Sequence, residues 1–268
     1  VASNDFTLTR IKLALNKNYI RNVLFFILPI TLTLLLQWGQ MASFRLVVED
    51  LYSVETLAFI AVGMSISGAL FSSIEGLATQ FYMPLYIKLI TNASLMTRTN
   101  VWNELASIMM PVYIGVAVYV VVFSPYLVKI LVAEKFYNAY IYTMIGAVIE
   151  LFRVTNNIVY QVSQSELSTK MTIFPYLLGF GAMLIGLCSI DVSESLWKVP
   201  VIIAVSYFIT LFVMYNRMKT LLAIQLDWKL LIKAILISLP MIGIFLLKIY
   251  KYFINSIFII VIGVIYLV

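Results

Sequence analysis

Residues 105–128 read LASIMMPVYIGVAVYVVVFSPYLV and contain no Asp, Glu, Lys or Arg. A membrane-spanning helix needs about 20 consecutive apolar residues, so this stretch is long enough to cross a bilayer. The whole chain has the same character, since 63% of its 268 residues are hydrophobic and only 11% are charged. Soluble domains carry about 25% charged residues. The sequence therefore predicts an all-α, polytopic membrane protein.

Further stretches of this kind, some interrupted by isolated charges, predict a bundle of about eight transmembrane helices. The predicted spans are residues 22–44, 56–87, 105–128, 136–161, 171–190, 199–216, 230–247 and 252–268. The joints between them are too short to hold a soluble domain. Any function must therefore lie in the helices.

Basic residues divide unequally between alternate joints, and cytoplasmic loops of membrane proteins retain Lys and Arg. Eleven such residues fall on one side and six on the other, which predicts that both termini of the chain are cytoplasmic. The larger set is Arg10, Lys12, Lys17, Arg21, Lys88, Arg98, Lys170, Arg217, Lys219, Lys229 and Lys233. The smaller set is Arg45, Lys129, Lys135, Lys198, Lys248 and Lys251. This scattering excludes a basic tract, so we expect no nucleic-acid partner.

Composition also excludes several kinds of catalytic site. The chain has no His and one Cys, Cys188, which removes intramolecular disulfides, zinc sites of the Cys/His type and Ser–His–Asp triads. We expect no cofactor, no metal ion and no catalytic residue.

The fourth predicted span carries a polar face. Glu150, Arg153, Asn157 and Gln161 follow one another at steps of three or four residues, so they project from one side of a helix. Ionisable groups at membrane depth are unfavourable unless they are paired or face a wet cavity. Two interpretations stay open: the face lines a cavity, or Glu150 and Arg153 neutralise each other while the amides bond between helices.

The second predicted span contains Glu75 without a basic residue in the same span. Such a carboxylate, like Glu150, is a candidate for coupling transport to a proton. The alternative is a hydrogen bond from Glu75 to a neighbouring helix. Gly68, Ser72 and Gly76 on this span form a ladder of small residues, which predicts close approach of another helix.

The first predicted span places Gln37 and Gln40 on one face and ends at Arg45. An arginine at a span end either reaches the lipid headgroups or faces a phosphate-bearing ligand, and both readings stay open. Trp102, like Trp197 and Trp228, lies near a span end, where tryptophans anchor helices at the membrane surface.

The chain resembles the Wzx-type polysaccharide flippases, which belong to one superfamily with multidrug exporters and the lipid II flippase. The resemblance covers most of the chain as a pattern of short motifs. These are Leu28-Pro29, Trp38, Ser43-Phe44-Arg45, Pro84-Leu85-Tyr86, Ala133-Glu134-Lys135-Phe136 and Ile149-Glu150-Leu151-Phe152-Arg153.

The resemblance implies a division of the chain. Residues 22–217 would be a six-helix exporter lobe and residues 218–268 two additional helices. Residues 1–21 would be a cytoplasmic linker or amphipathic segment, and the N-terminal lobe of a longer protein would be absent. Such a protein is expected in the bacterial cytoplasmic (inner) membrane.

The resemblance also implies the activity. We expect a transporter that moves undecaprenyl-pyrophosphate-linked oligosaccharide across this membrane for surface polysaccharide, or O-antigen, biosynthesis. It would bind its cargo without breaking bonds, so it is not expected to be an enzyme. Its partners would be the bilayer, the lipid-linked oligosaccharide, a polysaccharide polymerase and a chain-length regulator. The candidate phosphate and sugar partners are Arg45, Arg153, Gln37, Gln40, Asn157 and Gln161.

Two other functions remain open from the residues. A proton- or sodium-coupled multidrug or metabolite antiporter of the same fold would use Glu75 or Glu150 for coupling. A membrane polysaccharide polymerase or glycosyltransferase would need a large extramembrane loop or clustered acidic residues for acid–base or metal chemistry. The joints of this chain offer neither, which disfavours the enzyme.

Overall fold

The computed structural model describes residues 17–190 and 196–241. Within these ranges the chain forms helices joined by short turns, without a strand. The α-helices are α2 (Lys17–Ala42), α3 (Phe44–Leu51), α4 (Val54–Ile90), α5 (Leu95–Leu131), α6 (Tyr140–Ser165), α7 (Ile173–Cys188), α8 (Lys198–Met218) and α9 (Trp228–Ser238). Two 3-10 turns, η1 (Glu134–Ala139) and η2 (Thr169–Thr172), precede α6 and α7.

Five helices of the described part are long and apolar enough to cross a membrane. α4 and α5 have 37 residues each. At 1.5 Å per residue each is about 55 Å long, so both extend beyond a hydrocarbon core of about 30 Å. The prediction of an all-α, multi-pass membrane protein is confirmed. The five segments are Val23–Asp50, Val54–Ile90, Leu95–Leu131, Thr169–Cys188 and Lys198–Met218.

Helix starts follow the local sequence. Ser53 begins α4 by accepting a hydrogen bond from the Thr56 backbone N–H at 3.1 Å, and Ser94 begins α5 by accepting one from Thr97 at 3.2 Å. A side-chain oxygen in this position satisfies one of the free N–H groups at a helix start. The cap at Ser94 explains why α5 begins ten residues before the span predicted at 105–128.

The span predicted at 136–161 corresponds to α6, which has 26 residues but is not among the five apolar helices. Polar side chains are spread along it, which lowers its hydropathy. The spans predicted at 22–44, 56–87, 171–190 and 199–216 correspond to α2, α4, α7 and α8. Residues 230–247 begin within α9; the part beyond 241 lies outside the described residues, as do 252–268 and 1–16.

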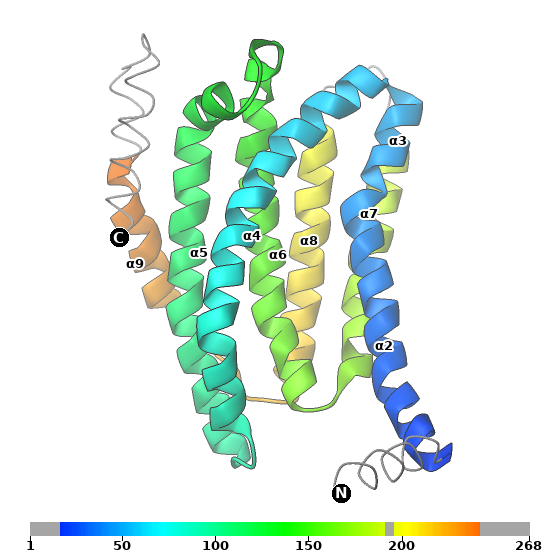
Figure 1. Ribbon diagram of the computed structural model, residues 1–268, viewed down its shortest axis with the longest axis vertical. Helices are drawn as coiled ribbons and strands as arrows, with labels where there is room; N and C mark the ends of the chain where they lie inside the picture. The colour runs from blue at the N-terminus through cyan, green and yellow to red at the C-terminus, as the bar shows by residue number, and fades with distance from the viewer. Residues whose placement is uncertain (1–16, 191–195, 242–268) are drawn as a thin grey trace, which may run out of the picture.

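The polar helix α6 lies inside the bundle. It packs against α4, α5 and α8, and Figure 1 shows it behind α4 and beside α8. α7 packs against α8, α2 against α7, and α9 against α5. Hydrocarbon cannot solvate polar side chains, so a helix that carries them is expected in the interior. More apolar helices therefore separate α6 from lipid.

α2 and α4 are connected through α3 and diverge from it, because α2 packs mainly against α7 and α4 mainly against α6 and α5 (Figure 1). We call the space between them the fork. α6 and α8 form its back wall.

Successive long helices run in opposite directions, so alternate joints lie at the same end of the bundle (Figure 1). The end formed by the start of α2, the α4–α5 turn, η2 and the α8–α9 joint is called the basic end. The cytoplasmic placement of this end stays a prediction. Its described basic residues include Arg21, Lys88, Arg98, Lys170, Arg217, Lys219 and Lys229.

Small residues hold α4 against α6. A methyl group on Gly63 would lie 2.5 Å from Tyr142 Cβ, and one on Gly146 would overlap the Ser67 hydroxyl. Thr143 Oγ1 donates a hydrogen bond to the Gly63 carbonyl at 3.0 Å across this contact. Glycines permit such an approach because they present no side chain.

The prediction of a helix contact at Gly68, Ser72 and Gly76 is wrong for the two glycines. A methyl on Gly76 would meet nothing within 4 Å, and one on Gly68 would meet only a carboxylate oxygen of Glu150, at 3.6 Å. Gly63 and Ser67 lie on the face of α4 that meets α6, whereas Gly68, Ser72 and Gly76 follow another face. Both sets have four-residue spacing, so the spacing alone cannot identify the packed face.

Trp102 is also placed differently from the prediction of a surface anchor. Its side chain is fully buried, and its indole Nε1 donates to the Ile158 carbonyl of α6 at 3.1 Å. Trp197 and Trp228 are exposed, as a surface anchor requires. α5 extends beyond the predicted span, which brings Trp102 into a helix interface.

Replacing Gly63 by Ala is expected to destabilise the protein by about 1–3 kcal/mol, the usual effect of overpacking. Gly76→Ala is the control, because its methyl group meets no neighbour and Ala favours a helix by about 0.5–1 kcal/mol. Thermal unfolding in detergent measures both variants. A Gly63→Ala protein as stable as the wild type would contradict the close contact between α4 and α6.

Candidate functional site

Three charged side chains meet inside the bundle. Arg153 of α6 lies between two carboxylates: its Nε is 2.6 Å from Glu150 Oε2, and its Nη2 is 2.9 Å from Glu75 Oε2 of α4. Asn157, one turn further along α6, donates from Nδ2 to Glu75 Oε1 at 2.7 Å. We call these four residues the charged cluster.

The charged cluster is largely withdrawn from the surface. The exposed fractions of the side chains are 13% for Arg153, 10% for Glu150 and 21% for Glu75. Two carboxylates share one guanidinium, so the fully ionised cluster has a net charge of −1. In a medium of low dielectric constant such charges are tolerated only when they are paired and hydrogen-bonded. Each member therefore depends on the others.

The structure contains both pairings that the sequence left open, one for Glu150 and one for Glu75. Glu150 and Arg153 form the pair that their three-residue spacing allows, and Glu75 is hydrogen-bonded by a neighbouring helix. The partner of Glu75 is the same polar face of α6. Glu75 and Arg153 lie far apart in the sequence, and the parallel packing of α4 on α6 brings them together.

A cavity of about 490 Å³ occupies the fork, within the range of small-molecule sites. Two of its lining residues on α2, Trp38 and Met41, are 70% and 54% exposed and give it an apolar rim. The rest of the lining combines apolar side chains with charges, hydroxyls and an amide. The polar and charged residues are Gln37, Arg45, Ser65, Ser72, Glu150, Arg153 and Tyr207.

The two arginines of the cavity differ in their partners. Arg153 is held by Glu75 and Glu150. Arg45, at the start of α3, lies with its guanidinium carbon 5.9 Å from the centre of the Phe44 ring. Within the described ranges, no carboxylate lies at ion-pair distance from Arg45. Arg45 is therefore the cation of this cavity that can pair with an anionic ligand.

Gln37 lines the cavity, whereas Gln40 does not. Gln40 is fully buried, and its Nε2 donates to Ser206 Oγ at 3.0 Å and to Thr210 Oγ1 at 3.1 Å, both on α8. The expectation that Gln40 contacts a sugar is therefore wrong for this structure. A three-residue step turns a helix by about 300°, which is enough to direct Gln40 to α8 while Gln37 faces the fork.

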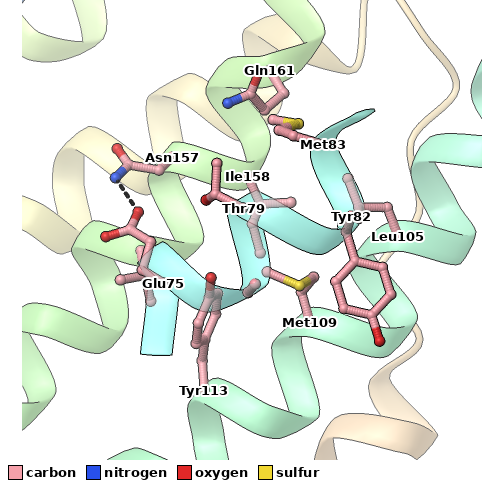
Figure 2. A pocket seen from close by; sticks show the side chains of 12 residues that line it. Glu75, Thr79, Tyr82, Met83, Leu105, Met109, Tyr113, Asn157, Ile158 and Gln161 are labelled. Carbon is pink, nitrogen blue, oxygen red and sulfur yellow. Dashed lines mark hydrogen bonds between the residues drawn. The ribbon is translucent and has the colours of Figure 1, made fainter. Parts of the chain in front are cut away.

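Asn157 and Gln161 lie lower on the polar face of α6 and line a separate pocket of about 40 Å³, the size of one or two water molecules. Figure 2 shows this pocket between α4, α5 and α6, with Glu75 and Asn157 joined at one side. Tyr113 of α5 directs its hydroxyl into the pocket near Glu75 (Figure 2). The polar face thus borders two spaces, with Glu75 and Arg153 between them.

Tyr113 and Tyr207 were not predicted from the sequence as site residues. They are 1% and 2% exposed and belong to stretches that are otherwise apolar. A tyrosine inside such a stretch is the signal that could have found them, because its hydroxyl needs a polar neighbour at membrane depth. Which space each one borders depends on the packing of α5 and α8.

In the part of the chain that the structure describes, no group of three or more His, Cys, Asp or Glu side chains could hold a metal ion. In the charged cluster, the Arg153 guanidinium itself occupies the place of a cation between Glu75 and Glu150. The arrangement is therefore an ion-pair network.

The chain matches no protein-family model, no curated protein and no solved structure. The resemblance to Wzx-type flippases stays a prediction. What the chain does is therefore inferred from its own residues.

Arg153→Ala is expected to destabilise the protein by about 3 kcal/mol or more, because it leaves Glu75 and Glu150 buried without a counter-charge. The triple variant Arg153→Ala, Glu75→Gln, Glu150→Gln removes all three charges and should recover most of this loss. Thermal unfolding in detergent compares the two. Equal stability of the single and triple variants would contradict the charge-pairing explanation.

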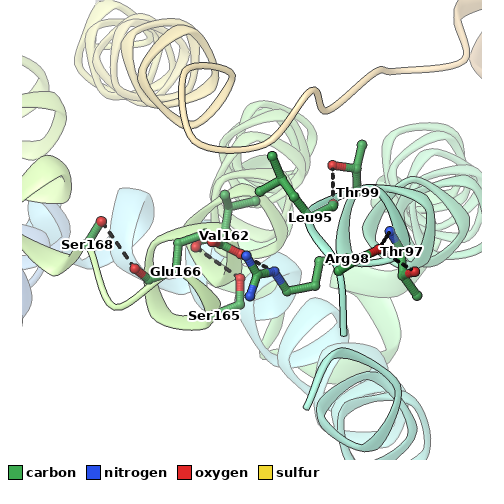
Figure 3. A network of polar contacts seen from close by, with 9 residues as sticks. Leu95, Thr97, Arg98, Thr99, Val162, Ser165, Glu166 and Ser168 are labelled. Carbon is green, nitrogen blue, oxygen red and sulfur yellow. Dashed lines mark hydrogen bonds and ion pairs between the residues drawn. The ribbon is translucent and has the colours of Figure 1, made fainter. Parts of the chain in front are cut away.

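Arg98→Ala is the matched control. Figure 3 shows Arg98 of α5 pointing toward Ser165 and Glu166 at the end of α6, and its Nε is 3.0 Å from Glu166 Oε1. This pair lies at the basic end, where the exposed fractions of the Arg98 and Glu166 side chains are 27% and 12%. Solvent reaches Arg98 more than Arg153, and its removal leaves one carboxylate unpaired instead of two, so the loss is expected to destabilise less, by about 1 kcal/mol.

Proposed function

We propose that this chain is a transporter lobe that moves an undecaprenyl-pyrophosphate-linked oligosaccharide across the bacterial cytoplasmic membrane for surface polysaccharide biosynthesis. The observation that carries the proposal is the cavity in the fork, where Arg45, which has no carboxylate at ion-pair distance among the described residues, lies beside amide and hydroxyl groups. Of the charges that line it, Arg153 and Glu150 belong to the charged cluster, where Arg153 is already paired. Arg45 is therefore the cation of the lining that an anionic ligand would meet.

The geometry suits the three parts of such a lipid. Pyrophosphate would pair with Arg45, whose guanidinium can form two parallel hydrogen bonds to phosphate oxygens. Sugar hydroxyls would exchange hydrogen bonds with Gln37, Ser65 and Ser72. The polyprenyl chain would remain in the bilayer beside the exposed Trp38 at the rim. Because the fork is open on one side, the sugar and pyrophosphate could lie in the cavity while the polyprenyl chain stays in the bilayer.

In this proposal Arg153 orders the back wall of the cavity and does not take the phosphate itself. Glu150 and Glu75 already occupy its Nε and Nη2. A ligand that took these two nitrogens would displace a buried carboxylate and leave that charge unpaired. The division of roles assigns anion binding to Arg45.

Orientation gives the cavity a place in the transport cycle. Arg45 lies at the end opposite the basic end. With the basic end in the cytoplasm, the cavity would lie in the outer half of the membrane, near α3. Arg45 then receives the pyrophosphate on the side where the lipid is released.

Arg45→Ala in the full-length protein is expected to lower surface polysaccharide about tenfold, the effect of losing one charge-assisted phosphate contact. Arg45→Lys should retain part of the activity, because it keeps the charge and loses the paired geometry. Lys135→Ala, at the same end but outside the cavity, is the control. Normal polysaccharide in Arg45→Ala cells at normal protein abundance would contradict the proposal.

A proton-coupled multidrug or metabolite antiporter of the same fold is the second candidate. The observation in its favour is the pair of carboxylates on one guanidinium, since a proton on Glu75 or Glu150 would neutralise the net charge of the cluster.

The two candidates differ in what deletion does. For the antiporter, we expect drug sensitivity with unaltered surface sugars, and reconstituted export that stops when the pH gradient is collapsed. Glu75→Gln should then uncouple export from the gradient. Loss of surface polysaccharide on deletion, without drug sensitivity, excludes the antiporter.

A further inference from the structure

Two cations at the basic end rest on phenylalanine rings. Lys170 Nζ of η2 lies 5.0 Å from the centre of the Phe25 ring on α2. The guanidinium carbon of Arg217, in the last turn of α8, lies 4.5 Å from the centre of the Phe174 ring on α7. Arg217 also donates from Nη1 to the Met171 carbonyl at 3.3 Å, which fixes it beside η2.

η2 brings these four side chains into one patch. It packs against α2, α7 and α8, and Thr169 Oγ1 donates to the Phe26 carbonyl of α2 at 3.3 Å. Lys170 lies in η2 and Phe174 at the start of α7, and Arg217 donates to the carbonyl of Met171, the residue that follows Lys170. We call Phe25, Lys170, Phe174 and Arg217 the basic aromatic patch.

The charge of this patch is not compensated. Over residues 17–190 and 196–241, no carboxylate lies at ion-pair distance from Lys170 or Arg217. Arg98, at the same end of the bundle, is neutralised by Glu166. Lys170 and Arg217 therefore differ from Arg98, whose charge is compensated within the bundle.

The rings of the patch lie at the outer surface of the bundle. Phe25 and Phe174 are 59% and 43% exposed, although both belong to segments that can cross a membrane. Exposed rings of membrane helices contact acyl chains, and cations near helix ends reach the headgroup layer. The patch therefore lies where lipid headgroups and acyl chains meet.

We propose that the basic aromatic patch binds the phosphate-bearing headgroup of an anionic phospholipid of the surrounding membrane. Lys170 supplies a point charge, and Arg217 supplies a planar fork that matches two phosphate oxygens. The rings of Phe25 and Phe174 stabilise the two cations by cation–π interactions and would contact the acyl chains. Basic pockets between transmembrane helices bind anionic headgroups in this way.

This site is distinct from the cavity in the fork. Arg45 lies at the opposite end of the bundle, and none of the four patch residues lines the cavity. The bound lipid would join α2, α7 and α8 at the basic end through one headgroup. Its role is to hold these helix ends together, independently of what the cavity carries.

Titration of the purified full-length protein in neutral detergent with short-chain phosphatidylglycerol, followed by native mass spectrometry, tests the proposal. Each cation near an anionic lipid is worth roughly fivefold in affinity, so Lys170→Gln with Arg217→Gln should weaken binding by roughly 25-fold. Lys170→Arg with Arg217→Lys keeps both charges and should bind nearly as well as the wild type. Lys88→Gln removes an exposed cation of α4 at the same end and should have no effect.

The same titration with phosphatidylcholine and with inorganic phosphate identifies the ligand. We expect phosphatidylglycerol to bind at least tenfold more tightly than either. Equal phosphatidylglycerol binding by the wild type and the Lys170→Gln, Arg217→Gln double variant would overturn the proposal. So would inorganic phosphate that binds as tightly as the lipid, because the ligand would then be a soluble anion.

Discussion

The pairing of Arg153 with Glu75 and Glu150 is the interaction on which the rest of the bundle depends. Three charges can lie within a membrane protein only if their partners are fixed in place. Two of them share α6, but Glu75 belongs to α4, so the two helices must keep one register. The close contact at Gly63 supplies that register, because small residues let the helix backbones approach.

The same constraint explains the shape of the cavity. α4 is committed to α6 by the charged cluster and by its small residues, while Gln40 joins α2 to α8 through Ser206 and Thr210. Each arm of the fork is therefore held by a different partner, and the space between the arms stays open. The polar face of α6 forms part of its back wall, which gives an apolar bundle a hydrophilic interior surface.

Charge is distributed unevenly along the bundle. In the interior, Arg153 is matched by carboxylates and serves structure. Arg45 at one end, and Lys170 and Arg217 at the other, have aromatic rings beside them and no carboxylate at ion-pair distance in the described ranges. Both unmatched sites lie where phosphate groups of lipids are found, near the ends of membrane helices. Position along the helices thus separates the structural cation Arg153 from the cations that we propose bind ligands.

The sequence by itself determined that this is a helical membrane protein and which polar side chains lie one helical turn apart. Long apolar stretches predicted membrane helices, and three-residue spacing predicted that Glu150 can reach Arg153, because both follow from local chain geometry. Only the tertiary structure decided that Arg153 also holds Glu75 and that Gln40 turns away from the fork. It also decided that Gly63 is the glycine of α4 that packs closely against α6. Apolar helix faces resemble one another, so the choice of neighbour arises only when all of the helices pack together.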